Sequence, residues 1–174
     1  MALSAADIRH AFDVLGNELA SRQESAELVV AGGAALVLLF GARETTKDVD
    51  AYFLRPAAAL VRSAAMQVAS ALDLPDDWLN DAAKGYFVGV TRGELLYDSP
   101  SLQVRAASVA QLLAMKLGAW RDAVDRADAR LLLSKLSGDK DSIWATIVPL
   151  IPPATLQKAS YAFEDLWEAA HGTQ

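Results

Sequence analysis

The fold is decided by one stretch, Ala31-Gly-Gly-Ala-Ala-Leu-Val-Leu-Leu-Phe-Gly-Ala-Arg-Glu-Thr-Thr-Lys-Asp-Val-Asp-Ala-Tyr-Phe53. A short buried strand is expected just before the two glycines, over Glu27–Ala31, and a short buried helix after them, over Ala34–Phe40. The helix should stop at Gly41. Asp48–Leu54 alternates polar and apolar residues, which predicts a second strand. A strand, a helix and a strand in succession indicate a mixed α/β fold.

The flanking sequence extends this core on both sides. Ser4 is a good helix N-cap, and apolar residues recur at helical spacing from there to about Arg22. Further helices are expected at Ala57–Leu72 and throughout the chain from Ser108 onward. Short strands are expected at Tyr86–Val90, Glu94–Tyr97 and Leu102–Arg105. We therefore predict an α/β (α+β) core over residues 1–105, with a mixed sheet flanked by helices, and a helical C-terminal region over residues 106–174 that packs on the core.

Composition removes several classes of function. The 174 residues include no cysteine and only two histidines, so thiolate metal sites, a cysteine nucleophile and a Ser-His-Asp triad lack raw material. The net charge of −6 argues against non-specific electrostatic binding of nucleic acid over the whole protein surface, although it leaves a local basic patch as an alternative. Carboxylates, 22 in all, are the plentiful chemical resource.

The longest apolar run is too short to span a membrane. It covers Leu28–Gly41, about 14 residues, whereas a transmembrane helix needs roughly 18–20. The first residues also lack the basic region and apolar stretch of a signal peptide. These features lead us to expect a cytoplasmic protein without a membrane partner.

Asp48 and Asp50 are the first candidate site residues. They stand at positions i and i+2 of a predicted strand, so both carboxylates should point to one face and Val49 to the other. Two like charges placed close together are unfavourable unless a cation lies between them. Mg²⁺ is the simplest candidate, because it binds one or two protein carboxylates together with substrate phosphates.

Gly32 and Gly33 are the second candidate feature. They lie where a strand ends and a helix begins, so a triphosphate could approach backbone N–H groups at the positive end of the helix. Taken alone, a Gly-Gly pair is usually a turn, and an Asp-x-Asp is usually a solvated strand face. A phosphate cradle followed by a carboxylate pair, in this order and linked by Arg43–Lys47, describes nucleotidyl transfer.

At this point the sequence resembles a known family. The first block consists of Gly32-Gly33, Arg43, Thr46 and Asp48-Val49-Asp50. The second consists of Leu112-Leu113-Ala-Met-Lys116-Leu117-Gly-Ala119-Trp-Arg121, followed by Asp125 and Asp128. Together they resemble the polymerase-β-type nucleotidyltransferase superfamily, and most of all its minimal bacterial members related to the AbiEii toxins of type IV toxin–antitoxin systems.

The resemblance implies a role for each block. Asp48 and Asp50 would hold Mg²⁺, while Gly32 and Gly33 would contact the phosphates of a nucleoside triphosphate. Arg43 or Thr46 would assist them, and Lys116 would neutralise triphosphate charge as a point charge. Lys47 belongs to the same candidate set. A solvated loop remains an alternative for Arg43 and Lys47, a snorkelling side chain for Lys116, and helix-surface ion pairing with Arg121 for the Asp125–Asp128 pair.

Active members of the superfamily usually carry a third carboxylate on a later strand. Glu94 and Asp98 are the candidates here, and a surface-loop role is equally open to both. The leading hypothesis is a Mg²⁺-dependent enzyme that moves a nucleoside monophosphate to a hydroxyl on RNA (tRNA among the candidates), protein or a small molecule. The alternatives are a module that binds nucleotide or a cognate partner protein without turnover, as in a toxin–antitoxin pair, and a structural protein without a ligand.

Overall fold

The computed structural model describes residues 2–172, so Met1 and residues 173–174, which the two predicted regions include, lie outside the described residues. The chain divides into two compact units. The first comprises the described residues up to Lys84 together with Arg92–Ala107. The second comprises Gly85–Thr91 and the described residues from Ser108 onward. Each unit is described below by itself.

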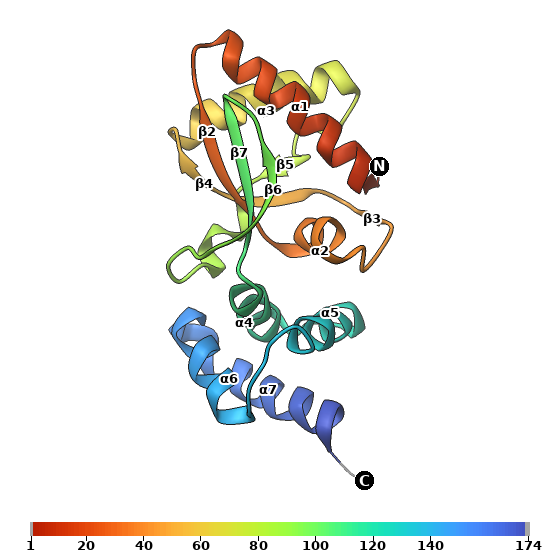
Figure 1. The fold of residues 1–174 in the computed structure, drawn as a ribbon, viewed down its shortest axis with the longest axis vertical. Helices are drawn as coiled ribbons and strands as arrows, with labels where there is room; N and C mark the ends of the chain where they lie inside the picture. The colour runs from red at the N-terminus through yellow and green to blue at the C-terminus, as the bar shows by residue number, and fades with distance from the viewer. Residues whose placement is uncertain (1, 173–174) are drawn as a thin grey trace. The chain divides into compact units, whose positions relative to one another are not determined.

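The first unit is built on a five-stranded mixed sheet of order β5-β4-β2-β7-β6, which confirms the predicted α+β class (Figure 1). Strand β2 lies antiparallel to β4 and parallel to β7, while β5 is parallel to β4 and β6 is antiparallel to β7. A separate two-stranded sheet pairs β1 with β3. The strands span Leu3–Ser4 (β1), Ala26–Val30 (β2), Thr45–Thr46 (β3), Val49–Arg55 (β4), Leu79–Asn80 (β5), Arg92–Asp98 (β6) and Leu102–Ala107 (β7).

Three helices complete this unit: α1 (Ala5–Ser21), α2 (Gly32–Phe40) and α3 (Ala58–Leu72). Helix α1 begins where the sequence predicts, because Ser4 and Asp7 form a capping box. The Asp7 amide donates to the Ser4 hydroxyl at 3.2 Å, and the Ser4 amide donates to the Asp7 carboxylate at 2.8 Å. The apolar stripe of α1 is fully buried against α3 and β7.

The sheet has one covered face and one face of intermediate exposure. On the covered side lies Trp78, which is completely buried, donates its indole N–H to the carbonyl of Ala65 at 3.0 Å and contacts the ring of Phe12. Val49 and Ala51 of β4 are buried, whereas Asp50 and Tyr52, which alternate with them, are only half-buried. The polar residues of β4 therefore occupy the less covered face.

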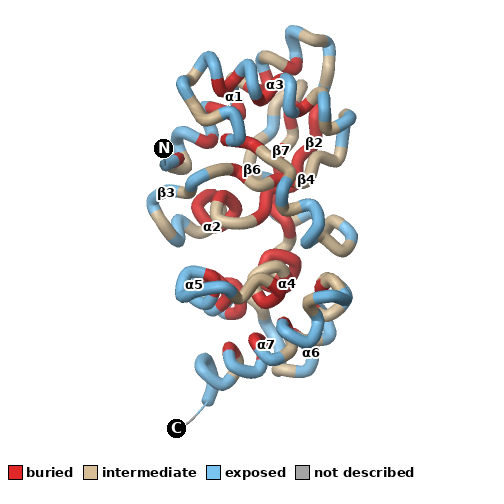
Figure 2. The backbone as a smooth tube through the Cα atoms, turned by 180° about the vertical axis from the view of Figure 1, so that it is seen from behind, coloured by how far each residue is buried: buried red, intermediate tan, exposed pale blue. Residues whose placement is uncertain are grey.

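The second unit is helical. It contains α4 (Val109–Ala119), α5 (Ala123–Leu133), α6 (Lys140–Ile147) and α7 (Leu156–His171), with short 3₁₀ turns η2 (Val148–Leu150) and η3 (Pro153–Thr155). Helix α4 packs against α5, α6 and α7, and its tube is buried along most of its length, whereas α5 and α7 have exposed outer faces (Figure 2).

The strand predicted at Tyr86–Val90 is wrong. A 3₁₀ turn, η1 (Ala82–Tyr86), leads into irregular chain there. The buried side chain of Gln111 binds this chain in place of a strand. Its amide donates to the carbonyl of Gly89 at 2.9 Å and accepts from the N–H of Thr91 at 2.8 Å. Because a side chain satisfies the backbone, the alternation of residues does not produce a sheet pairing. Among residues 2–172, no helix combines the length and apolar character needed to cross a membrane.

Candidate functional site

The junction between β2 and α2 lies directly beside β4. The amide of Ala31, the residue after β2, donates to the carbonyl of Asp50 at 2.8 Å. Gly32 then adopts φ +61°, a conformation that favours glycine. A Cβ added there would lie 3.0 Å from Oδ2 of Asp50. The absence of a side chain at residue 32 therefore allows the backbone of the β2–α2 junction to lie directly against the Asp50 carboxylate.

Gly33 makes a second close approach in the same place. A Cβ on Gly33 would lie 2.7 Å from the hydroxyl oxygen of Thr46 and 3.5 Å from Nη1 of Arg43. Ala31 at the N-cap has no side-chain oxygen to offer the first turn of α2. The first turn of α2 therefore has no side-chain cap for its N–H groups, and such groups bind phosphate at a helix start. The structure thus brings together Gly32, Gly33, Arg43, Thr46 and Asp50.

The segment that carries Thr46 is held by the start of the chain. Strand β3 pairs antiparallel with β1, with Leu3 opposite Thr46 and Ser4 opposite Thr45. Leu3 is completely buried. Sequence reasoning missed this pairing, since two-residue strands more than forty positions apart have no periodic signature. Within the linker Arg43–Lys47, Thr45 and Thr46 therefore belong to a paired strand, and the other residues lie outside it.

The carboxylate pair shows the alternation expected of its spacing. Val49 is completely buried, and Asp48 and Asp50 on either side of it are half-buried. The hydroxyl of Thr46 donates to the backbone carbonyl of Asp48 at 3.3 Å, which fixes the turn that enters β4. Lys47, in the same turn, is exposed.

Asn80 is the neighbour of Asp50 on the adjacent parallel strand β5. Its amide nitrogen donates to the carbonyl of Asp77 at 3.3 Å, and its oxygen accepts from the N–H of Ala82 at 3.0 Å. Strand register thus places a neutral amide, not an acid, beside the second aspartate. Strand β5 has only two residues, so no sequence pattern predicted it.

Asp81, the next residue, is an acid that is already neutralised. Its carboxylate accepts from the guanidinium of Arg62 at 2.6 Å and from the ammonium of Lys84 at 3.3 Å. The hydrogen bond from Arg62 lowers the pKa of Asp81, burial opposes this effect, and Lys84 adds to it. Asp81 is therefore a structural ion-pair partner at the end of β5.

Glu94 and Asp98, the predicted third carboxylates, lie on β6 at the far edge of the sheet. Strands β2 and β7 separate β6 from β4, so the two backbones are about 14 Å apart at ordinary strand spacing. Both residues are exposed. Within residues 2–172, no three His, Cys, Asp or Glu side chains are grouped so that they could hold a metal ion. The structure does not bring Glu94 or Asp98 to the carboxylate pair.

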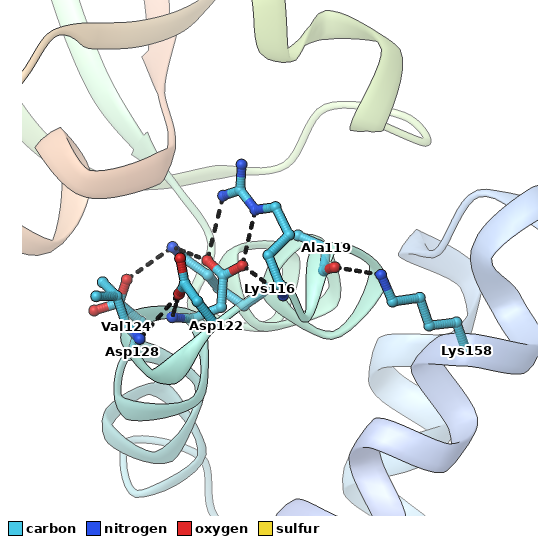
Figure 3. Close-up of polar contacts among 8 residues, drawn as sticks. Lys116, Ala119, Asp122, Val124, Asp128 and Lys158 are labelled. Atoms are coloured by element: carbon cyan, nitrogen blue, oxygen red, sulfur yellow. Dashed lines mark hydrogen bonds and ion pairs between the residues drawn. The ribbon is translucent and has the colours of Figure 1, made fainter.

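Lys116 belongs to the second unit, where it forms the centre of a buried ion cluster (Figure 3). Its ammonium lies 2.9 Å from Oδ1 of Asp125 and 2.7 Å from Oδ2 of Asp128, and its side chain is only 12 % exposed. Arg121 adds a backbone N–H and a side-chain Nε, each 3.0 Å from Oδ2 of Asp125. The acidic pair is thus a buried partner of Lys116, which goes beyond the helix-surface pairing with Arg121 that the sequence offered.

Asp125 has the most perturbed environment of this cluster. Burial by itself would raise its pKa, since its side chain is 2 % exposed. Hydrogen bonds from the Arg121 side chain, from Lys116 and from the Arg121 backbone outweigh burial, so the pKa of Asp125 lies well below its usual range. The carboxylate is ionised at all physiological pH values.

The residues of the first unit fit a magnesium ion with a phosphate ligand. Asp48 and Asp50 supply oxygen donors of the kind Mg²⁺ prefers, and two protein carboxylates leave coordination positions for substrate phosphates. The close approach of Gly32 to the Asp50 carboxylate depends on the absence of a Cβ at residue 32. These residues would hold the ion, and the glycines with the N-terminus of α2 would hold the phosphates.

The first unit thus combines a mixed sheet with a glycine pair at the start of a helix and an aspartate pair at the start of the adjoining strand β4. The chain belongs to the family described as "Nucleotidyltransferase of unknown function (DUF6036)", whose model matches residues 10–137. Membership implies transfer of a nucleoside monophosphate in general, and a nucleoside triphosphate as the substrate. Comparisons with curated proteins and with solved structures found no match.

Proposed function

We propose that this protein is a Mg²⁺-dependent nucleotidyltransferase that moves a nucleoside monophosphate from a nucleoside triphosphate to a hydroxyl group and releases pyrophosphate. The acceptor hydroxyl belongs to RNA, with tRNA among the candidates, to a protein or to a small molecule. One observation carries the proposal: a Cβ on Gly32 would lie 3.0 Å from Oδ2 of Asp50, so the phosphate cradle and the metal carboxylate adjoin each other.

Each part of the site has a defined task in this proposal. Asp48 and Asp50 hold the magnesium ion, which when bound offsets the charge of the phosphoryl oxygens. The N–H groups at the start of α2 bind the triphosphate, and Gly32 and Gly33 keep that approach open. The guanidinium of Arg43 lies beside Gly33 and stabilises the negative charge that develops on the leaving pyrophosphate.

A transfer assay tests the proposal. The protein is incubated with Mg²⁺ and each labelled nucleoside triphosphate, with total RNA or cell lysate as the acceptor source. We expect label transfer that disappears with the magnesium and in an Asp48→Ala/Asp50→Ala variant. Transfer that survives in the double variant would show that the metal site is assigned to the wrong residues.

A second candidate function is nucleotide binding without turnover. It is favoured by the neutral Asn80 beside Asp50 and by the separation of Glu94 and Asp98 from the pair. In this case the same residues bind Mg²⁺ and triphosphate, but no carboxylate activates the acceptor hydroxyl.

The variant Asn80→Asp separates the two candidates. It places a third carboxylate next to Asp50 with almost no change in volume. If the protein is a binding module, the variant should acquire magnesium-dependent transfer that the wild type lacks. If the wild type is already active, the added charge should change its rate by far less than the Asp48→Ala/Asp50→Ala variant does. Glu94→Gln is the matched control, and we expect it to leave both binding and transfer unchanged.

We also infer a relationship to the AbiEii-type toxins and their minimal nucleotidyltransferase relatives. It is supported by the order Gly-Gly, Arg-x-x-Thr-x-Asp-x-Asp and then Lys116 with its acidic partners. In this proposal the protein acts in the cytoplasm and has a cognate partner protein. Co-purification of the natively expressed chain tests the partner, and a single species that is fully active alone would contradict it.

A further inference from the structure

Three arginines that are far apart in the sequence gather around Glu27. Nε of Arg92 donates to Oε1 of Glu27 at 2.6 Å, and Nε of Arg55 lies 3.3 Å from Oε2. Arg105 donates to the carbonyl of Gly93 at 3.1 Å, and its positive charge also acts on Glu27. We call Arg55, Arg92 and Arg105 the arginine cluster.

The arginine cluster carries more positive charge than the single carboxylate of Glu27 can balance. The hydrogen bond from Arg92 is the main cause of the lowered pKa of Glu27, burial opposes it, and the charges of all three arginines add to it, so Glu27 is ionised at neutral pH. One negative charge faces three positive charges. The side chains of Arg55 and Arg92 are 70 % and 53 % exposed. A chain of net charge −6 therefore presents a local excess of positive charge to solvent.

The cluster occupies the same face of the sheet as Asp50. Val29 of β2 lies opposite Tyr52 of β4 and opposite Arg105 of β7. Residues two apart on a strand share a face, which places Asp50 with Tyr52 and Glu27 with Val29. Because Arg55 and Arg92 contact Glu27, the whole cluster lies on the face that carries the second aspartate.

Strand geometry gives the distance between the two features. Arg105 is two strands and two residues away from Asp50, which corresponds to roughly 12 Å between their backbones. Arg55 lies on β4 itself, at the opposite end from Asp50, and Arg92 lies on β6 opposite Ala107 of β7, and the side chains of both reach Glu27. A small acceptor bound at Asp50 would not reach them, whereas an extended chain of phosphates would.

We propose that the arginine cluster binds the backbone phosphates of a polynucleotide acceptor whose reacting hydroxyl lies at Asp48 and Asp50. This inference rests on the proposed function for the position of the hydroxyl, and it selects RNA from the acceptor classes named above. Arg62 and Lys84 do not join the cluster, because both side chains contact Asp81, the residue after β5.

Binding of a labelled single-stranded RNA oligonucleotide tests the inference without activity. Fluorescence anisotropy is measured without Mg²⁺ or nucleotide at several salt concentrations. Arg55→Ala should weaken binding several-fold and reduce the slope of log K against log salt by about 0.7, the value for one lost phosphate contact with a single strand. Arg55→Lys should restore most of the slope. The matched control is Arg9→Ala, which removes an exposed arginine from α1, the helix packed on β7 from the other face.

A variant with the opposite sign makes the test independent of folding damage. Glu27→Gln removes the negative charge from the cluster, so it should tighten RNA binding and steepen the salt dependence. DNA of the same sequence shows whether phosphates alone suffice or the ribose hydroxyl contributes. Equal weakening by Arg9→Ala, or unchanged binding in both Arg55→Ala and Glu27→Gln, would overturn the inference. Magnesium–nucleotide binding is measured separately, so a failure of the proposed function would be seen as a loss of that signal alone.

Discussion

At the scale of single residues, the site depends on two glycines. Sequence alone predicted Gly32, Gly33 and the aspartate pair as candidate site residues, because a missing side chain and a carboxylate are visible in the sequence itself. It did not identify Asn80, Leu3 or the partners of Glu27. Their positions depend on strand register, and register between distant segments leaves no trace in local periodicity.

The first prediction compares Gly32→Ala with Gly41→Ala. Both glycines have positive φ, +61° and +57°, so each alanine should destabilise the fold by about 1–2 kcal/mol. Only at residue 32 does the new methyl group meet the Asp50 carboxylate, since a Cβ on Gly41 has no atom within 4 Å. Gly32→Ala should therefore lose the rise in melting temperature caused by Mg²⁺ and nucleotide, and Gly41→Ala should keep it. If both variants lose the ligand-induced rise in melting temperature equally, backbone strain, and not the contact with the Asp50 carboxylate, explains the effect.

A second prediction concerns Lys116 in the helical unit. Lys116→Met removes the ammonium and leaves two buried carboxylates facing each other, which should cost about 3–5 kcal/mol of unfolding free energy. Arg121→Ala removes a side chain that is 71 % exposed and leaves its backbone N–H on Asp125, so it should cost at most about 1 kcal/mol. Chemical denaturation measures both. A small loss for Lys116→Met would show that the cluster does not stabilise the unit.

At the scale of elements, the long helices and the main-sheet strands were predictable, whereas the two-residue strands β1, β3 and β5 were not. Helices α1 and α3 carry an apolar stripe and span more than four turns, and their predicted positions agree with the structure to within two residues. Tyr86–Val90 failed because Gln111, twenty or more positions away, satisfies its backbone. The Lys116 cluster joins α4 to α5. The spacing of Asp125 and Asp128 predicted pairing with Arg121, but it did not predict that the ammonium of Lys116 is buried against both acids.

The junction of α4 and α5 supplies a pH-dependent prediction. The pKa of Asp125 is lowered in the folded state, so its contribution to stability is fully present above about 3.8, its ordinary value, and is lost as the pH falls below that value. The unfolding free energy should therefore decline between pH 4 and the acid limit. Asp125→Asn should be less stable at pH 7 and should show a flatter decline on acidification. A parallel decline in both proteins would contradict the assignment.

At the scale of the whole molecule, the fold class and the nucleotidyltransferase family were predicted from the sequence. The sheet topology confirms the first, and the family match confirms the second. What the overall composition concealed is the distribution of charge. A net charge of −6 hides a local excess of arginine on the sheet face and a fully paired Lys116 in the helical unit. Composition averages over the surface, whereas binding depends on which charges share a face.

The most direct test of the central claim is the melting temperature of the wild type and of Asp48→Asn/Asp50→Asn with and without Mg²⁺ and a non-hydrolysable nucleoside triphosphate. The wild type should be stabilised by the two ligands together and much less by either alone, because ligands that bind only the folded state raise its stability. The double variant should fold but should not respond to the ligands, because it lacks the two carboxylates that would hold the ion. Stabilisation of equal size in the double variant would contradict the account.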